Sequence, residues 1–203
     1  MDFADNLCAL GEVVGFNWEP IGLIKLSRAD IEANGWSKAP ALVGLARVAP
    51  RDMGEQQFLS RCKALHEIWQ VIPKGDLRRL LAATGVPAKA IKEHGTLKLL
   101  QALLNVLESL NQANEEVGAF ASEDEPENWN ERNERLATLF VLNDLRVSDA
   151  HTLTRDDIQK LELLGFDLAE LHAGYGRALD FVFDGVINAF SLVNEEMKNL
   201  LNR

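Results

Sequence analysis

The chain has 203 residues, of which 47% are hydrophobic and 26% are charged, a balance typical of soluble globular proteins. Its formal net charge of −10 argues against a protein that coats nucleic acid, because phosphate binding over a wide area needs a concentrated basic surface. No apolar run approaches the roughly 18–20 residues of a membrane helix, and the acidic start at residues 1–5 is unlike a secretory signal. Cys8 and Cys62 lie far apart and match no disulfide framework or metal motif, so we expect a cytoplasmic protein.

Residues 1–50 are the least regular part and are predicted to form a small irregular N-terminal extension. Residues 4–14 favour a short helix, whereas the apolar run at residues 21–26 is short enough to be a strand. We expect the extension to cover the core of a larger domain with its two tryptophans, Trp18 and Trp36. A surface for a partner or a second copy of the chain is the alternative.

From residue 51 to residue 203 the spacing of apolar residues predicts an all-α helical bundle with a long C-terminal helix. The first clear amphipathic helix carries apolar side chains at steps of three and four: Phe58, Cys62, Leu65, Trp69 and Ile72. His66 lies beside this stripe, as a core or partly exposed residue. The last helix repeats the same spacing over about 25 residues, or roughly 38 Å, with apolar residues at Leu179, Val182, Phe183, Val186, Ile187, Phe190, Val193, Met197 and Leu200.

Four shorter features punctuate the bundle. Residues 112–130 are acidic and poor in apolar side chains, which predicts a solvated loop, with a contact for a basic partner as the alternative. Thr154–Asp157 matches a capping box that starts a short helix. Gly174–Gly176 is interpreted as a flexible hinge before the last helix, and Gly185 within that helix is expected at a close contact between helices.

Residues 143–151 are the one stretch where several groups able to do chemistry crowd together. Cleavage of RNA without a metal needs a proton acceptor near the ribose 2′-hydroxyl and a fixed positive charge on the phosphate. Arg146 and His151 supply those two groups. Residues five apart on a straight helix point about 140° away from each other. Convergence therefore requires a break near Ser148 and Asp149, which are poor in helix interiors, or a second copy of the chain.

An Arg, four intervening residues and a His beside a helix of a small bundle resemble the signature of the HEPN superfamily. Many of its members are metal-independent ribonucleases of toxin–antitoxin and antiviral defence systems. The resemblance implies that Arg146 binds the phosphate and that His151 acts as acid or base or positions the scissile group. It gives Asn143, Asp144 and Asp149 supporting roles, in which either aspartate orients the pair by a hydrogen bond. It further implies RNA as the substrate, a homodimer with a shared cleft, an antitoxin or defence protein as partner, and no cofactor or metal.

The chain departs from the family pattern at two places. Val147 follows the Arg where many members carry a polar residue, which is typical of a weak, divergent or inactive member. Residues 152–174 separate the motif from the last long helix, whereas in many members the motif leads directly into it. The resemblance covers residues 51–203 and leaves residues 1–50 unexplained.

Three other interpretations of the same stretch remain open. Arg146 is able to pair with an aspartate while Asp149 caps a helix, which would be a purely structural arrangement. The chain is also able to act as a non-catalytic helical dimerisation or protein-interaction module, which its net charge and Val147 favour. A metal site is the third, built from Asp144, Asp149, His151, Asp156 and Asp157, although their spacing matches no metal motif.

Overall fold

A computed structural model describes residues 2–40, 42–147 and 153–203. Every regular element in this part of the chain is an α-helix or a 3-10 helix, which confirms the all-α prediction. No helix among these residues is both long and apolar enough to cross a membrane. Asp149 and His151 lie outside the described residues.

Contacts between residues divide the chain into two compact units, each assembled from segments far apart in sequence. Unit 1 comprises Met1–Ser27, Trp69–Glu134 and Phe190–Arg203, and unit 2 comprises Arg28–Ile68 and Arg135–Ala189. Two of the four divisions fall within α4 (Glu55–Gln70) and α10 (Gly176–Leu201), so each of these helices gives residues to both units.

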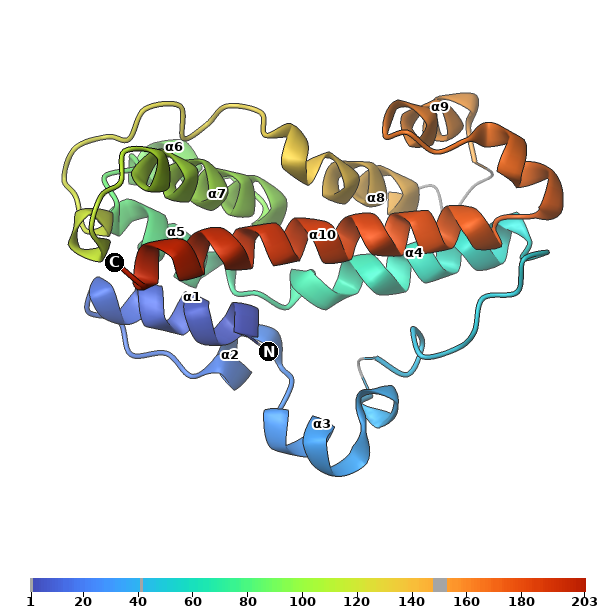
Figure 1. The fold of residues 1–203 in the computed structure, drawn as a ribbon, viewed down its shortest axis with the longest axis horizontal. Coiled ribbons are helices and arrows are strands. Elements are labelled where there is room, and N and C mark those ends of the chain that lie inside the picture. The colour runs from blue at the N-terminus through green and yellow to red at the C-terminus, as the bar shows by residue number, and fades with distance from the viewer. Residues whose placement is uncertain (1, 41, 148–152) are drawn as a thin grey trace. The chain divides into compact units, whose positions relative to one another are not determined.

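Unit 1 is built on α7, whose apolar side chains are buried as its spacing predicts. Its helices are α1 (Asp2–Val13), α2 (Pro20–Ile24), α5 (Lys74–Ala83), α6 (Ala88–Ile91), α7 (Thr96–Gln112), the 3-10 helix η2 (Val117–Phe120) and the C-terminal part of α10. Leu99, Leu103 and Leu107 of α7 are buried, and α5 packs against both α7 and α6 (Figure 1). The sequence pattern therefore located this core correctly.

Two helices occupy most of residues 2–24, which corrects part of the expected extension. α1 confirms the helix predicted at residues 4–14, and Asn6 Nδ2 donates to Asn194 Oδ1 of α10 at 2.7 Å. The strand predicted at residues 21–26 is wrong, because α2 occupies this run. Pro20 stands in the first turn of α2, where its fixed φ suits a helix and its missing N–H costs nothing.

The two tryptophans of this region differ in their packing. Gly11 gives Trp18 room, since a Cβ at that position would lie 2.7 Å from the indole ring. Phe16 stacks on the same ring, with centroids 5.1 Å apart. Trp18 therefore covers unit 1 as expected, whereas Trp36 of unit 2 is 53% exposed and covers no core within its unit.

The acidic segment predicted as a solvated loop is irregular but well anchored within unit 1. Asn105 Nδ2 of α7 donates to the carbonyl oxygens of Asn128, Trp129 and Glu131 at 2.9–3.1 Å. Phe120 and Trp129 are buried. One amide side chain thus fixes the end of the segment, and the acidic residues lie on a held backbone rather than on a free linker.

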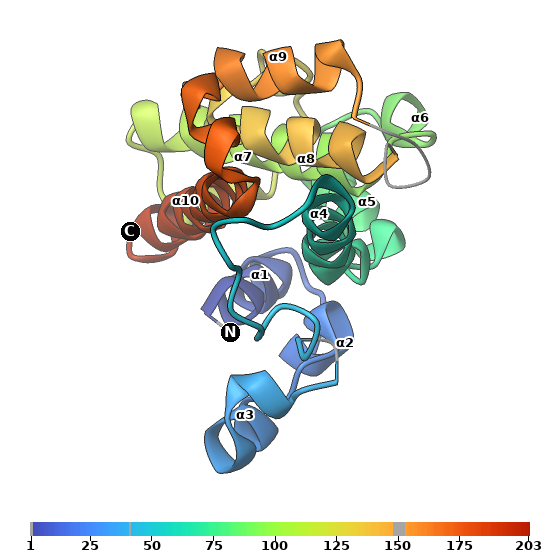
Figure 2. The same ribbon diagram turned by 90° about the vertical axis from the view of Figure 1, so that its right-hand side faces the viewer.

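Unit 2 holds the chemistry-bearing stretch. Its helices are α3 (Arg28–Asn34), the 3-10 helix η1 (Trp36–Lys38), most of α4, α8 (Ala137–Val147), α9 (Arg155–Leu163), the 3-10 helix η5 (Leu168–Ala173) and the N-terminal part of α10, with the 3-10 helix η3 (Glu134–Leu136) at the division. The predicted stripe of α4 is buried throughout, which confirms its amphipathic reading. α9 packs alongside α8 (Figure 2).

Gly174 and Gly176 are packed against another segment of unit 2, so their interpretation as a flexible hinge is wrong. Gly174 has φ +111°, and a Cβ there would lie 2.6 Å from the carbonyl oxygen of Arg51. A Cβ at Gly176 would clash with the carbonyl oxygen of Pro50. Tyr175 N donates to Met53 O at 2.9 Å between the two glycines. The glycines therefore permit two backbones to approach each other closely.

Gly185 confirms the close helix contact predicted for it. A Cβ at Gly185 would lie 2.6 Å from Thr138 Cγ2, so the missing side chain lets α8 lie against α10 within unit 2. This contact holds the helix that carries Arg146.

Candidate functional site

Arg146 lies near the C-terminal end of α8 and is exposed. The buried side of α8 is formed by Leu139, Leu142 and Leu145, at steps of three, and continues the buried Leu136 of η3. Burial of these leucines directs Arg146 away from the core. Asn143, three residues before Arg146, is half-buried at the edge of this side.

Asn143 holds the guanidinium of Arg146 from one turn earlier on the same helix. Arg146 Nε donates to Asn143 Oδ1 at 3.3 Å, the i, i+3 geometry that brings side chains of an α-helix together. A guanidinium carries five N–H donors in a planar fork. Within the described ranges Nε is the donor that meets an acceptor, and the exposed side chain presents the rest of its fork away from the core.

A second contact on Asn143 comes from His66 of α4, which the sequence did not link to this stretch. His66 is 1% exposed, and its imidazole is hydrogen-bonded to the Asn143 side chain. The pKa of His66 is lowered to about 4: burial is the largest cause, the positive charge of Arg146 acts in the same direction, and the hydrogen bond with Asn143 opposes both. His66 is therefore neutral at pH 7, and His66, Asn143 and Arg146 form a relay from the core of unit 2 to its surface.

The relay suits anion binding and not proton transfer to a substrate. Arg146 is exposed and always charged, and phosphate oxygens are the natural acceptors of its fork. His66 is too deeply buried to touch a substrate, and a pKa near 4 makes it a poor base at neutral pH. The acid or base expected of this site is still His151, which lies outside the described residues.

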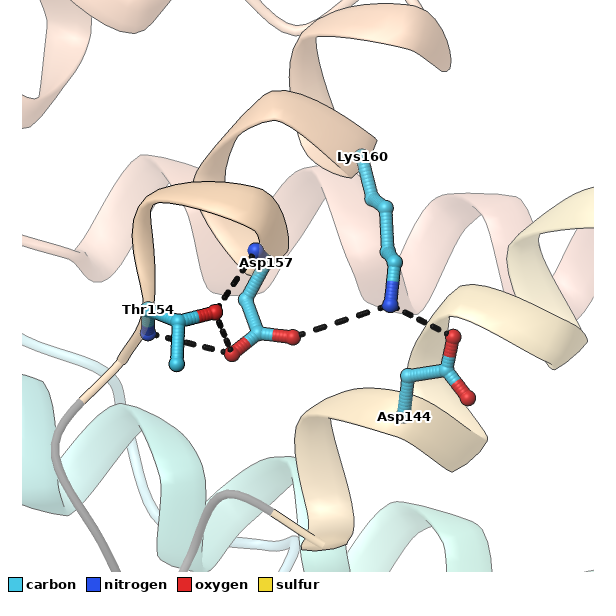
Figure 3. Close-up of polar contacts among 4 residues, drawn as sticks. All are labelled: Asp144, Thr154, Asp157 and Lys160. Atoms are coloured by element: carbon cyan, nitrogen blue, oxygen red, sulfur yellow. Dashed lines mark hydrogen bonds and ion pairs between the residues drawn. The ribbon is translucent and has the colours of Figure 1, made fainter.

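Asp144, the neighbour of Asn143, pairs with a lysine rather than with Arg146. Lys160 Nζ of α9 lies 2.8 Å from Asp144 Oδ2 and 3.8 Å from Asp157 Oδ1, so one ammonium lies between two carboxylates (Figure 3). The hydrogen bond to Asp144 is the main cause that raises the pKa of Lys160, and burial partly opposes it. Asp144 thus joins α8 to α9, and its expected role in orienting the Arg–His pair has no support in these contacts.

The capping box predicted for Thr154 and Asp157 is confirmed. Thr154 Oγ1 accepts from Asp157 N at 3.2 Å, and Thr154 N donates to Asp157 Oδ2 at 3.1 Å (Figure 3). These two bonds satisfy backbone groups that would otherwise lack partners at the start of α9. α9 therefore begins at a fixed residue shortly after the motif.

Glu55, at the start of α4, holds the chain on the C-terminal side of the motif. Its Oε1 accepts from Leu153 N at 2.8 Å, and its Oε2 accepts from Tyr175 Oη at 3.4 Å. Burial, aided by the negative charge of Glu55, raises the pKa of Tyr175. Both flanks of the motif are thus held in place. Arg146 belongs to helix α8, and Leu153 is hydrogen-bonded to Glu55.

The proposed metal ligands and the cysteines take other roles where they are described. Lys160 occupies the space between Asp144 and Asp157, and the described ranges contain no group of three His, Cys, Asp or Glu side chains placed to hold a metal ion. Cys62 is buried on α4, and burial raises the pKa of its thiol. Cys62 is therefore a core residue, as its place on the stripe predicts.

The chain matches no protein-family model, no curated protein and no solved structure. Its function must therefore be argued from its own residues.

Proposed function

We propose that this protein is a metal-independent endoribonuclease of the HEPN type, acting within a toxin–antitoxin or phage-defence system. The observation that carries the proposal is the exposed guanidinium of Arg146, held by Asn143 at the head of the Arg-x4-His motif. A positive charge fixed in advance stabilises charge that develops on a phosphate without the cost of reorganising at the moment of reaction.

In the proposed reaction the ribose 2′-oxygen attacks the adjacent phosphorus. A P–O2′ bond forms and the P–O5′ bond breaks, which leaves a 2′,3′-cyclic phosphate and a free 5′-hydroxyl. His151 moves a proton from the 2′-hydroxyl or to the 5′-oxygen. Arg146 binds the non-bridging oxygens, where negative charge increases.

Two copies of the chain act together in this proposal. One acid–base histidine per chain performs one of the two proton transfers, and a second copy placed at a shared cleft supplies the other. The homodimer is therefore part of the proposed mechanism, and RNA is its substrate.

The decisive experiment compares RNA cleavage by wild type with that of Arg146→Ala and His151→Ala. We expect each substitution to lower the cleavage rate by about 10²- to 10³-fold, because each removes a group that acts on the reacting atoms. EDTA should have no effect on the wild type. Cleavage by wild type only after a divalent metal is added would overturn the proposal.

Arg155→Ala is the matched control, because Arg155 is an exposed arginine on the neighbouring α9. It should cleave as wild type does. Circular dichroism of all variants should keep the helical signal, so that a lost rate is not confused with lost folding. Arg146→Lys should be only partly active, because an ammonium keeps the charge and loses the fork.

A non-catalytic dimerisation or interaction module is the second candidate, and a different observation favours it. Leu163 of α9 is 86% exposed and Ile187 of α10 is 58% exposed. Large apolar side chains in water gain free energy when a second protein surface covers them. Intact RNA after incubation with a protein that sediments as a dimer would support this function instead.

A further inference from the structure

Unit 2 contains an open cavity of about 590 Å³ between the first turns of α4 and the segment of residues 44–53. Its volume falls within the range of small-molecule sites in proteins, about 300–1,000 Å³. No part of the proposed ribonuclease mechanism uses it.

The charge of this cavity is opposite to that of the whole chain. Among the described residues that line it, Arg47 and Arg61 are the charged ones and none is acidic. Within the described ranges neither guanidinium has a carboxylate partner. Arg61 Nη2 donates to the carbonyl oxygens of Leu45 and Arg47, at 3.0 and 2.8 Å. Two uncompensated positive charges thus lie together in a protein whose net charge is −10.

This arrangement costs free energy that an anion would offset. Burial lowers the pKa of Arg61 from its usual value, and the nearby charge of Arg47 lowers it further. Arg61 Nε is buried and has no hydrogen-bond acceptor within the described ranges. A bound anion would accept charge-assisted hydrogen bonds from the accessible donors of both arginines, and such bonds are about twice as strong as neutral ones.

The rest of the lining suits a ligand that carries more than an anionic group. Gln57 and Ser60 present exposed polar side chains from α4, while Val48 adds apolar surface. Val48 is 91% exposed, so its apolar surface is available for contact. A nucleotide combines these needs, because its phosphate suits arginine, its sugar and base edges suit amides and hydroxyls, and its base faces suit apolar side chains.

We propose that this cavity binds the phosphate group of a nucleotide, either as a free mononucleotide or within single-stranded RNA. In the second case the inference rests on the proposed function, since the cavity then holds part of the substrate. In the first case the cavity is an independent ligand site.

The first test titrates the full-length chain with AMP by isothermal calorimetry. Wild type should bind with a saturable isotherm. Arg47→Gln should weaken binding about tenfold, equivalent to about 1.4 kcal/mol, and Ser60→Glu should abolish it by placing a carboxylate in the cavity. Arg51→Gln is the control, because Arg51 is an exposed arginine on the same segment that does not line the cavity. It should bind as wild type does.

The second test measures binding of a 2′-O-methyl oligoribonucleotide by fluorescence anisotropy with the same variants. Binding that Arg47→Gln weakens and Arg51→Gln does not, in a protein that ignores AMP, assigns the cavity to RNA. If the wild type bound neither AMP nor the oligoribonucleotide, or if Arg47→Gln and Arg51→Gln weakened binding equally, the inference would be overturned. Because the oligonucleotide has no free 2′-hydroxyl and is not cleaved, a failure of the proposed ribonuclease activity leaves this result interpretable.

Discussion

His66 connects the core of unit 2 to the exposed guanidinium of Arg146 through the single side chain of Asn143. An imidazole at this depth is neutral at pH 7, because charging it would need water that the core excludes and would oppose the charge of Arg146. His66 thus acts on the site through Asn143, as a positioning residue. Its titration in the folded and unfolded chain also links the site to stability.

We predict that His66 makes the protein sensitive to acid. Its pKa is about 4 in the folded chain and about 6.5 when unfolded, so below pH 6.5 the unfolded state takes up a proton that the folded state does not. This difference lowers the free energy of unfolding as the pH falls from 6.5 to 4. Between pH 7 and pH 5 the loss from this group is about 2 kcal/mol.

Urea denaturation of wild type and His66→Gln at several pH values measures this effect. Glutamine is neutral at every pH tested and retains a group that can hydrogen-bond to Asn143. The free energy of unfolding of the His66→Gln protein should therefore fall less between pH 7 and pH 5. The difference in slope between the two proteins isolates His66 from the other histidines. Parallel curves would show that His66 is not the group responsible.

The relay illustrates what the sequence could and could not predict at this scale. Asn143 was recognisable as a polar residue in an apolar stripe, and His66 as a histidine beside another stripe. Each pattern describes one helix alone. The contact between them depends on how α4 and α8 pack within unit 2, and no local spacing encodes that packing.

At the scale of elements, Gly174 and Gly176 show how the same residues serve a different purpose from the one their type suggests. Glycine permits motion, but it also permits the backbone of residues 174–176 to lie against residues 50–53. The two uses are indistinguishable in sequence, because both need only the absence of a side chain. Because residues 174–176 pack closely against residues 50–53, the start of α10 is held in place.

We predict that Gly174→Ala lowers the free energy of unfolding by about 2–4 kcal/mol. Alanine at φ +111° is strained, and its Cβ would lie 2.6 Å from the carbonyl oxygen of Arg51. Gly54→Ala is the control, because a Cβ at Gly54 meets nothing within 4 Å. Chemical denaturation should place it within about 0.5 kcal/mol of wild type. If the two variants were equally stable, the interpretation of residues 174–176 as a flexible hinge would be supported instead.

Elements with a strong period were predicted well, and those with short runs were not. The stripe of α4 and the capping box of α9 depend on spacing that only a helix satisfies. Residues 21–26 carried too few positions to separate a helix from a strand, and Pro20 at the first turn decided for the helix α2. The shortness of this run, more than its composition, limited the prediction of its secondary structure.

At the scale of the whole molecule, the net charge of −10 limits how RNA is able to bind. A protein that holds nucleic acid by many lysines and arginines loses affinity steeply with salt, because each phosphate contact releases counterions. The cations proposed here to meet phosphate are few: Arg146 in each of two copies, and Arg47 and Arg61 if the cavity of unit 2 also holds RNA.

A small number of contacts predicts a shallow salt dependence. With a slope of about −0.7 per contact for single strands, two contacts lower the affinity about sevenfold between 50 and 200 mM KCl, and four contacts about 50-fold. The 2′-O-methyl oligoribonucleotide measures this by fluorescence anisotropy without cleavage. A loss of a thousandfold would require about seven phosphate contacts, and hence a basic surface that neither Arg146 nor the cavity provides. An affinity unaffected by salt would mean that these arginines do not meet the phosphates at all.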